Sequence, residues 1–161
     1  MRRLSGVVLA GAMLILPAFS QSPLAQDAAP AAAQQPPPVK TLLEGEAVFI
    51  IYAANPGKDA DYEQVIAKLK DALAKSTDPQ AKAQAAGWTI TKLTKSLTPD
   101  GGGTYLHVIN PVIQGADYSI VNIVYAQSTD DEKRAFYDLY KGALKGGLSQ
   151  WSASVVSKLG Q

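Results

Sequence analysis

The chain has 161 residues, of which 47% are hydrophobic and 18% are charged, and its formal net charge is +1. This length fits one domain of ordinary size, and the near-neutral charge argues against a nucleic-acid-binding protein, which usually carries a clear basic excess. The absence of cysteine excludes disulfides and cysteine-based metal sites, and a single histidine excludes a multi-histidine centre within one chain. We therefore expect neither a metal site nor a cofactor.

Residues 1–20 carry the features of a secretory signal peptide. Arg2 and Arg3 give a basic start, and an apolar run follows from Val7 to Phe19. As a helix this run would span about 20 Å, which is short of the roughly 30 Å hydrocarbon core of a membrane. We predict cleavage after Ser20, with Ala25 as the alternative, and a secreted or periplasmic protein that keeps no stable membrane anchor.

Residues 21–40 are typical of a disordered linker. They consist mainly of Ala, Pro and Gln, and consecutive prolines at 36–38 favour an extended polyproline conformation. Such a segment has too little apolar bulk to offset its ordering entropy. A single folded domain is therefore expected over residues 41–161.

The start of this domain predicts a strand and two helices. Residues 46–53 are apolar on both faces, which is typical of a central strand. Apolar side chains then recur at helical spacing between Tyr62 and Leu73, and Asp59 is placed to cap that helix. Residues 78–87 predict a second, short helix, with Asp as the cap, Pro at the first helical position and Gly at the end.

The middle of the domain predicts a β-hairpin. Residues 88–95 alternate between apolar and polar side chains, residues 105–110 form the partner strand, and the loop 99–103 contains Pro, Asp and three Gly residues.

The last part of the domain, residues 117–158, predicts two helices and a final strand. Residues 117–127 fit a helix by spacing and a strand by their Ile and Val content, and Asp117 as an N-cap favours a short helix. Residues 130–145 are clearly amphipathic with an acidic first turn, and residues 151–158 alternate as a final strand.

The element order β-α-β-β-α-β, with short extra helices, predicts an α+β domain of the ferredoxin-like βαββαβ type. Its antiparallel sheet would carry helices on one face. The other face then needs a cover, because Trp88, Tyr105, His107 and the strand valines are too apolar to face water together. A homodimer through this open face is the simplest cover.

In this element order the chain resembles the dimeric α/β-barrel group of ferredoxin-like proteins, which includes small monooxygenases. The resemblance covers the segment from Thr41 to Lys158 and rests on element order alone. Haem-degrading members of the group use Asn, Trp and His. This chain has Asn55, Trp88 and His107, but their placement does not match that pattern, so the resemblance implies no active site here.

His107 is the one residue with obvious acid–base chemistry. Because Leu106 and Val108 point to the opposite side of the strand, we expect His107 on the open face as a general base, a haem ligand or a hydrogen-bonded structural residue. No carboxylate lies near it in sequence to orient the ring, which favours the structural role. Candidate ligand-binding residues, chosen for their aromatic character, are Trp88, Tyr105, His107, Tyr118 and Tyr125.

Two functions are compatible with these features. The first is an exported, non-enzymatic module that binds a small apolar ligand or a protein partner through the sheet face. The alternative is a cofactor-independent monooxygenase-like enzyme that uses His107 as its base. The first needs only a shaped apolar surface, so the sequence favours it.

Overall fold

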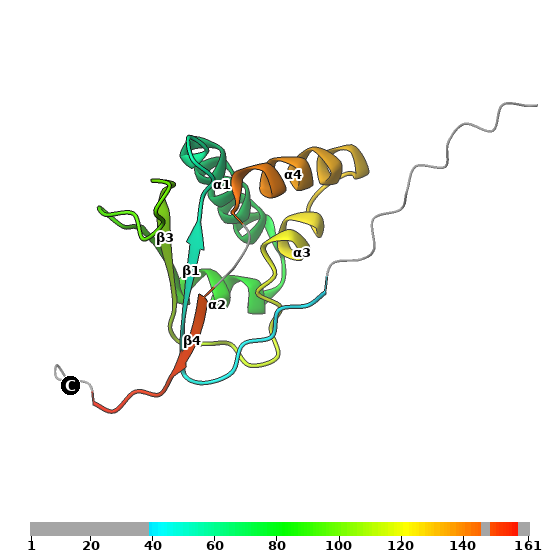
Figure 1. Ribbon diagram of the computed structural model, residues 1–161. Coiled ribbons are helices and arrows are strands. Elements are labelled where there is room, and N and C mark those ends of the chain that lie inside the picture. The colour runs from blue at the N-terminus through cyan, green and yellow to red at the C-terminus, as the bar shows by residue number, and fades with distance from the viewer. Residues whose placement is uncertain (1–38, 146–148, 158–161) are drawn as a thin grey trace, which may run out of the picture. The chain divides into compact units, whose positions relative to one another are not determined.

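The structure is a computed structural model, and it describes residues 39–145 and 149–157. The expected signal peptide and most of the expected linker lie outside these residues. Helices and strands follow one another along the chain as shown in Figure 1. The elements are β1 (Ala47–Ala53), α1 (Asp59–Lys75), α2 (Pro79–Gly87), β2 (Trp88–Lys92), β3 (Thr104–Ile109), α3 (Ile120–Tyr125), α4 (Asp130–Ala143) and β4 (Ser149–Ala153).

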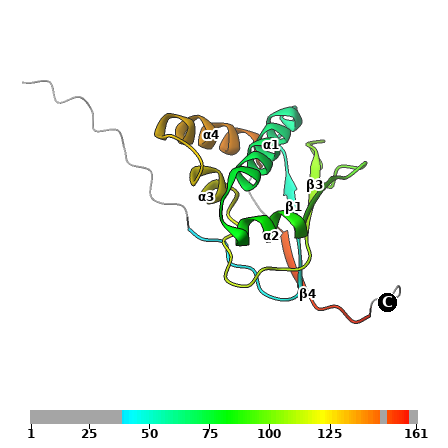
Figure 2. The ribbon, with the colours of Figure 1, turned by 180° about the vertical axis from the view of Figure 1, so that it is seen from behind.

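The strands form one sheet in the order β2-β3-β1-β4, and every neighbouring pair is antiparallel. This order, with β1 and β3 in the centre, is that of the ferredoxin-like βαββαβ fold. All the described helices lie on one side of the sheet, as Figures 1 and 2 show from opposite directions. The predicted fold class is therefore confirmed, and α2 and α3 are the short extra helices.

The core lies between the sheet and α1. In β1, Val48, Ile50 and Tyr52 are buried, and the residues between them are half-buried. The matching stripe of α1 includes Tyr62 and Val65, both of which are completely buried. The two periodicities of strand and helix thus bring one face of each element into the same core.

The structure corrects two predicted helix caps. Asp59 is the first residue of α1, and its carboxylate accepts a hydrogen bond from the backbone N–H of Gly103 at 2.9 Å. Residues 117–127 do contain a helix, but its N-cap is Ser119. Asp117 instead accepts the backbone N–H of Thr41 at 2.8 Å, which ties the start of the domain to the segment before α3.

The final strand is shorter and earlier than the predicted 151–158. β4 ends at Ala153, where its pairing with β1 stops at Ala47. Beyond the strand, Val155 and Val156 are exposed. The alternating Trp, Ala and Val residues therefore extend past the length of the partner strand, which limits the pairing.

The expected position of His107 on the open face is wrong. Tyr105, His107 and Ile109 of β3 are buried against the helices, whereas Leu106 and Val108 lie on the opposite face. The register explains this orientation, because His107 is paired with Ile50 of β1, which faces the core. Trp88, which pairs with Ile109, also lies on the helix side.

Candidate functional site

His107 lies at the centre of the buried side of the sheet with no exposed surface. The indole Nε1–H of Trp88 donates to Nδ1 of His107 at 3.2 Å. An indole nitrogen can only donate, so Nδ1 is the unprotonated nitrogen of the neutral ring. Nε2 therefore carries the proton and donates it to the Tyr62 hydroxyl at 3.0 Å. These contacts fix both the ring orientation and its tautomer.

Burial keeps this imidazole neutral. Removing it from water disfavours the charged form and lowers the pKa of His107 to about 3. Burial likewise raises the pKa of Tyr62 far above its usual range. Near neutral pH the pair is therefore an uncharged hydrogen bond within the core.

An aromatic cluster surrounds the histidine. The ring centroids of Tyr52 and His107 are 4.5 Å apart, those of Tyr62 and Tyr105 are 4.7 Å apart, and those of Trp88 and Tyr118 are 5.5 Å apart. Such separations are within the range of favourable aromatic contacts. Of the predicted ligand-binding residues, the structure brings together Trp88, Tyr105, His107 and Tyr118.

Tyr125 is not part of this cluster. It packs edge-to-face on Phe136 of α4, with ring centroids 6.4 Å apart. The Asn55 side chain likewise has another use, since its amide donates to the carbonyls of Gly142 and Leu144 at the end of α4. The structure therefore joins Trp88 to His107 directly and holds Asn55 at the end of a helix.

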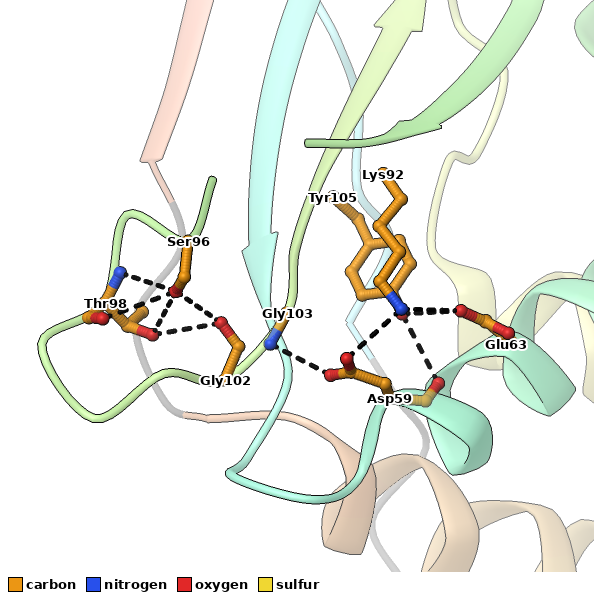
Figure 3. A network of polar contacts seen from close by, with 8 residues as sticks. All are labelled: Asp59, Glu63, Lys92, Ser96, Thr98, Gly102, Gly103 and Tyr105. Carbon is orange, nitrogen blue, oxygen red and sulfur yellow. Dashed lines mark hydrogen bonds and ion pairs between the residues drawn. The ribbon is translucent and has the colours of Figure 1, made fainter. Parts of the chain in front are cut away.

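A polar network links the hairpin to the first turn of α1, as Figure 3 shows. Lys92 Nζ lies 3.1 Å from an Asp59 carboxylate oxygen and 3.0 Å from a Glu63 carboxylate oxygen. The Tyr105 hydroxyl donates to the same Glu63 oxygen at 3.0 Å. Because each charged group has an oppositely charged neighbour, the network is a structural tie between strand and helix.

The pKa values of this network follow from its contacts. The hydrogen bond from Lys92 lowers the pKa of Glu63, and the same contact raises the pKa of Lys92. Burial raises the pKa of Tyr105. None of these three shifts brings a group toward neutral pH, where a general acid or base would be tuned.

The face of the sheet opposite the helices, which we call the open face, is mainly apolar and has no charged side chain at its strand positions. The strand register places Phe49 between Val108 and Trp151, and it pairs Ile51 with Leu106. Trp151 is 52% exposed. By alternation, the open-face side chains are Ala47, Phe49, Ile51 and Ala53 of β1, Thr89 and Thr91 of β2, Thr104, Leu106 and Val108 of β3, and Ser149, Trp151 and Ala153 of β4.

The sequence alone did not indicate the partner of His107 at Tyr62 or the residues that form the open face. Tyr62 was assigned only to the apolar stripe of α1, although a tyrosine hydroxyl on a buried helix face signals a polar partner inside the core. The open face was expected to carry Trp88, Tyr105 and His107, and it carries Phe49, Leu106 and Trp151 instead. An apolar run such as residues 47–53 does not by itself show which of its two faces meets the helices.

No family model matches the chain, and no curated protein matches it. Among solved structures, SnoaB, a cofactor-independent oxygenase from Streptomyces nogalater, is 14% identical with a TM-score of 0.37, over 73% of this chain and 100% of that chain. An overlap at this TM-score is too low to assign an activity.

None of the helices in the described residues has both the length and the hydropathy of a membrane-spanning segment. In the same part of the chain, no group of three or more His, Asp or Glu side chains is placed to hold a metal ion.

Proposed function

We propose that the protein is an exported, non-enzymatic binding module whose open face is covered by a second copy of the same chain. The observation that carries this proposal is the composition of the open face, which holds Phe49, Ile51, Leu106, Val108 and Trp151 and has no charged side chain. Export is supported by the N-terminal sequence pattern of residues 1–20.

An uncharged sheet face favours a copy of itself as its partner. A sheet face that is exposed to water usually carries polar side chains, whereas this face has large apolar side chains and no charged one among its strand positions. Two such faces meet at about 10 Å without bringing like charges together. A strongly charged partner would find no complementary group there.

The apolar surface continues past the last strand. Val155 is 41% exposed and Val156 is 99% exposed, directly after the end of β4. The backbone N–H of Val155 donates to the Glu46 carboxylate at 2.6 Å, which holds this segment beside the start of β1. The two valines therefore leave exposed apolar side chains at the end of the sheet where β1 begins.

The geometry of His107 favours this module over the oxygenase alternative. A general base must reach the proton that it removes. Here the imidazole has no exposed surface, and both of its nitrogens bond to Trp88 and Tyr62. These contacts support a structural role for His107 in the core.

Sedimentation velocity on matched variants tests the proposal. Leu106→Lys introduces a charge into the open face, and Leu42→Lys makes the same change at a position that is 58% exposed outside the sheet. The full chain and Leu42→Lys should sediment as dimers at micromolar concentration, and Leu106→Lys should sediment as a monomer. If all three proteins sediment alike, the open face is not a self-association surface.

A further inference from the structure

A groove opens on the helix side of the sheet, between α1, α2 and β2. Its volume is about 420 Å³. This lies within the usual range of small-molecule sites, which is roughly 300–1,000 Å³. The residues that line it are Ile66, Leu69, Lys70, Leu73 and Ala74 of α1, Ala85 of α2, and Trp88 and Ile90 of β2.

The groove is lined by apolar side chains and by one charged side chain, that of Lys70. Ile66 and Ile90 are only half-buried, although both belong to the apolar sides of their elements. Among the described lining residues Lys70 alone is charged, and it is exposed. An apolar groove with a single ammonium group complements a molecule that has an apolar body and one anionic end.

One wall of the groove is held rigidly. The Trp88 indole is fixed by its hydrogen bond to Nδ1 of His107 and by its contact with Tyr118, whose hydroxyl accepts the backbone N–H of Ile113 at 2.9 Å. A ring positioned in this way loses little freedom when a ligand packs on it, which favours binding. The polar contacts of His107 would then serve to shape the groove.

From these features we infer that the groove binds a small amphiphilic carboxylate, with its apolar chain against Trp88 and Ile90 and its carboxylate near Lys70. A volume of about 420 Å³ lies in the lower part of the range of small-molecule sites. A medium-chain fatty acid or an aromatic acid is of this size. This site is separate from the open face, because Trp88 and Ile90 lie on the helix side of the sheet.

Titration calorimetry with decanoate as the probe tests this inference on the full chain. For a ligand of this size we expect a Kd of about 0.1–1 mM. Decanol, which has the same chain without the charge, should bind more weakly. Equal binding of decanol and decanoate would overturn the assignment of the anionic end.

Reversing the charge of Lys70 tests whether it contacts the carboxylate of the ligand. An exposed ion pair changes affinity by up to about fivefold, so Lys70→Glu, which replaces attraction by repulsion, should weaken decanoate binding by about tenfold. Lys82→Glu makes the same change on an exposed residue of α2 that does not line the groove, and it should leave binding unchanged. A similar loss in both variants would indicate a general charge effect and contradict a contact with Lys70.

The location of the site is tested by filling it. Ala85→Phe and Ala74→Phe place a ring into the groove from α2 and α1 respectively, and both alanines are exposed, so the fold should tolerate the change. Each should abolish decanoate binding, whereas Ala86→Phe, one position away and outside the groove, should not. Retained binding in both groove variants would overturn the proposal, and loss of binding in Leu106→Lys alone would place the ligand on the open face.

Discussion

The indole Nε1 of Trp88 lies 3.2 Å from Nδ1 of His107, and this hydrogen bond joins the edge strand β2 to its neighbour β3 inside the core. The contact decides the chemistry of the histidine, because it occupies the nitrogen that a base would use. The other ring nitrogen is occupied by Tyr62. His107, the one histidine of the chain, is thus an uncharged side chain that packs in the core.

The pH dependence of stability should reveal this neutral histidine. Its pKa is about 3 in the folded chain, against about 6.5 when unfolded, so below pH 6.5 the unfolded state binds a proton that the native state does not. Stability is therefore full above pH 6.5 and is lost as the pH falls toward 3. Between pH 7.5 and pH 5 we expect the free energy of unfolding to fall by about 2 kcal/mol, measured by urea denaturation.

The control for this prediction is His107→Gln. Glutamine does not titrate, so the variant should show little change over the same pH interval, whatever its absolute stability. An equal pH dependence in both proteins would assign the effect to other groups.

Removal of the Tyr62 hydroxyl tests the second hydrogen bond of the histidine. Tyr62→Phe leaves the Nε2–H of His107 without its acceptor in a fully buried site, which should cost about 1–3 kcal/mol in the free energy of unfolding. Tyr125→Phe is the matched control, since Tyr125 is half-buried against Phe136 and outside the cluster. Equal, small effects of the two changes on chemical denaturation would show that the buried hydrogen bond is not needed.

How much of the fold follows from the sequence can be seen at β1 and α1. The apolar run of residues 47–53 and the helical spacing from Tyr62 to Leu73 place both elements nearly at their observed bounds. Both are long and strongly patterned, so local sequence decides them. The end of β4 is set instead by its pairing with β1, which no local pattern contains.

The candidate site was less predictable, because it depends on the orientation of strands. Alternation along β3 separates His107 from Leu106, but only the register with Ile50 shows which of the two faces the helices. The partners of His107 are 45 residues away at Tyr62 and 19 residues away at Trp88. Contacts over such separations follow from packing of the whole domain.

Gly102 of the hairpin loop and Gly142 of α4 should respond oppositely to substitution by alanine. A Cβ atom at Gly102 would lie 2.1 Å from the backbone oxygen of Ala54, so Gly102→Ala should destabilise the protein by about 1–3 kcal/mol. A Cβ atom at Gly142 in α4 meets nothing within 4 Å, and Gly142→Ala should stabilise it by about 0.5–1 kcal/mol. Thermal unfolding measures both, and a stable Gly102→Ala protein would contradict the close approach of the hairpin loop to β1.

Distances between two copies of the chain test most directly whether two open faces pack against each other. The chain has no cysteine, so Thr91→Cys places a single spin label on the open face, and Lys82→Cys places one on α2 as the control. If two open faces pack at about 10 Å, pulsed electron paramagnetic resonance should give one narrow intermolecular distance below about 30 Å for Thr91→Cys and a longer one for Lys82→Cys. The absence of any intermolecular distance for Thr91→Cys, or a shorter distance for Lys82→Cys, would contradict a dimer covered face to face.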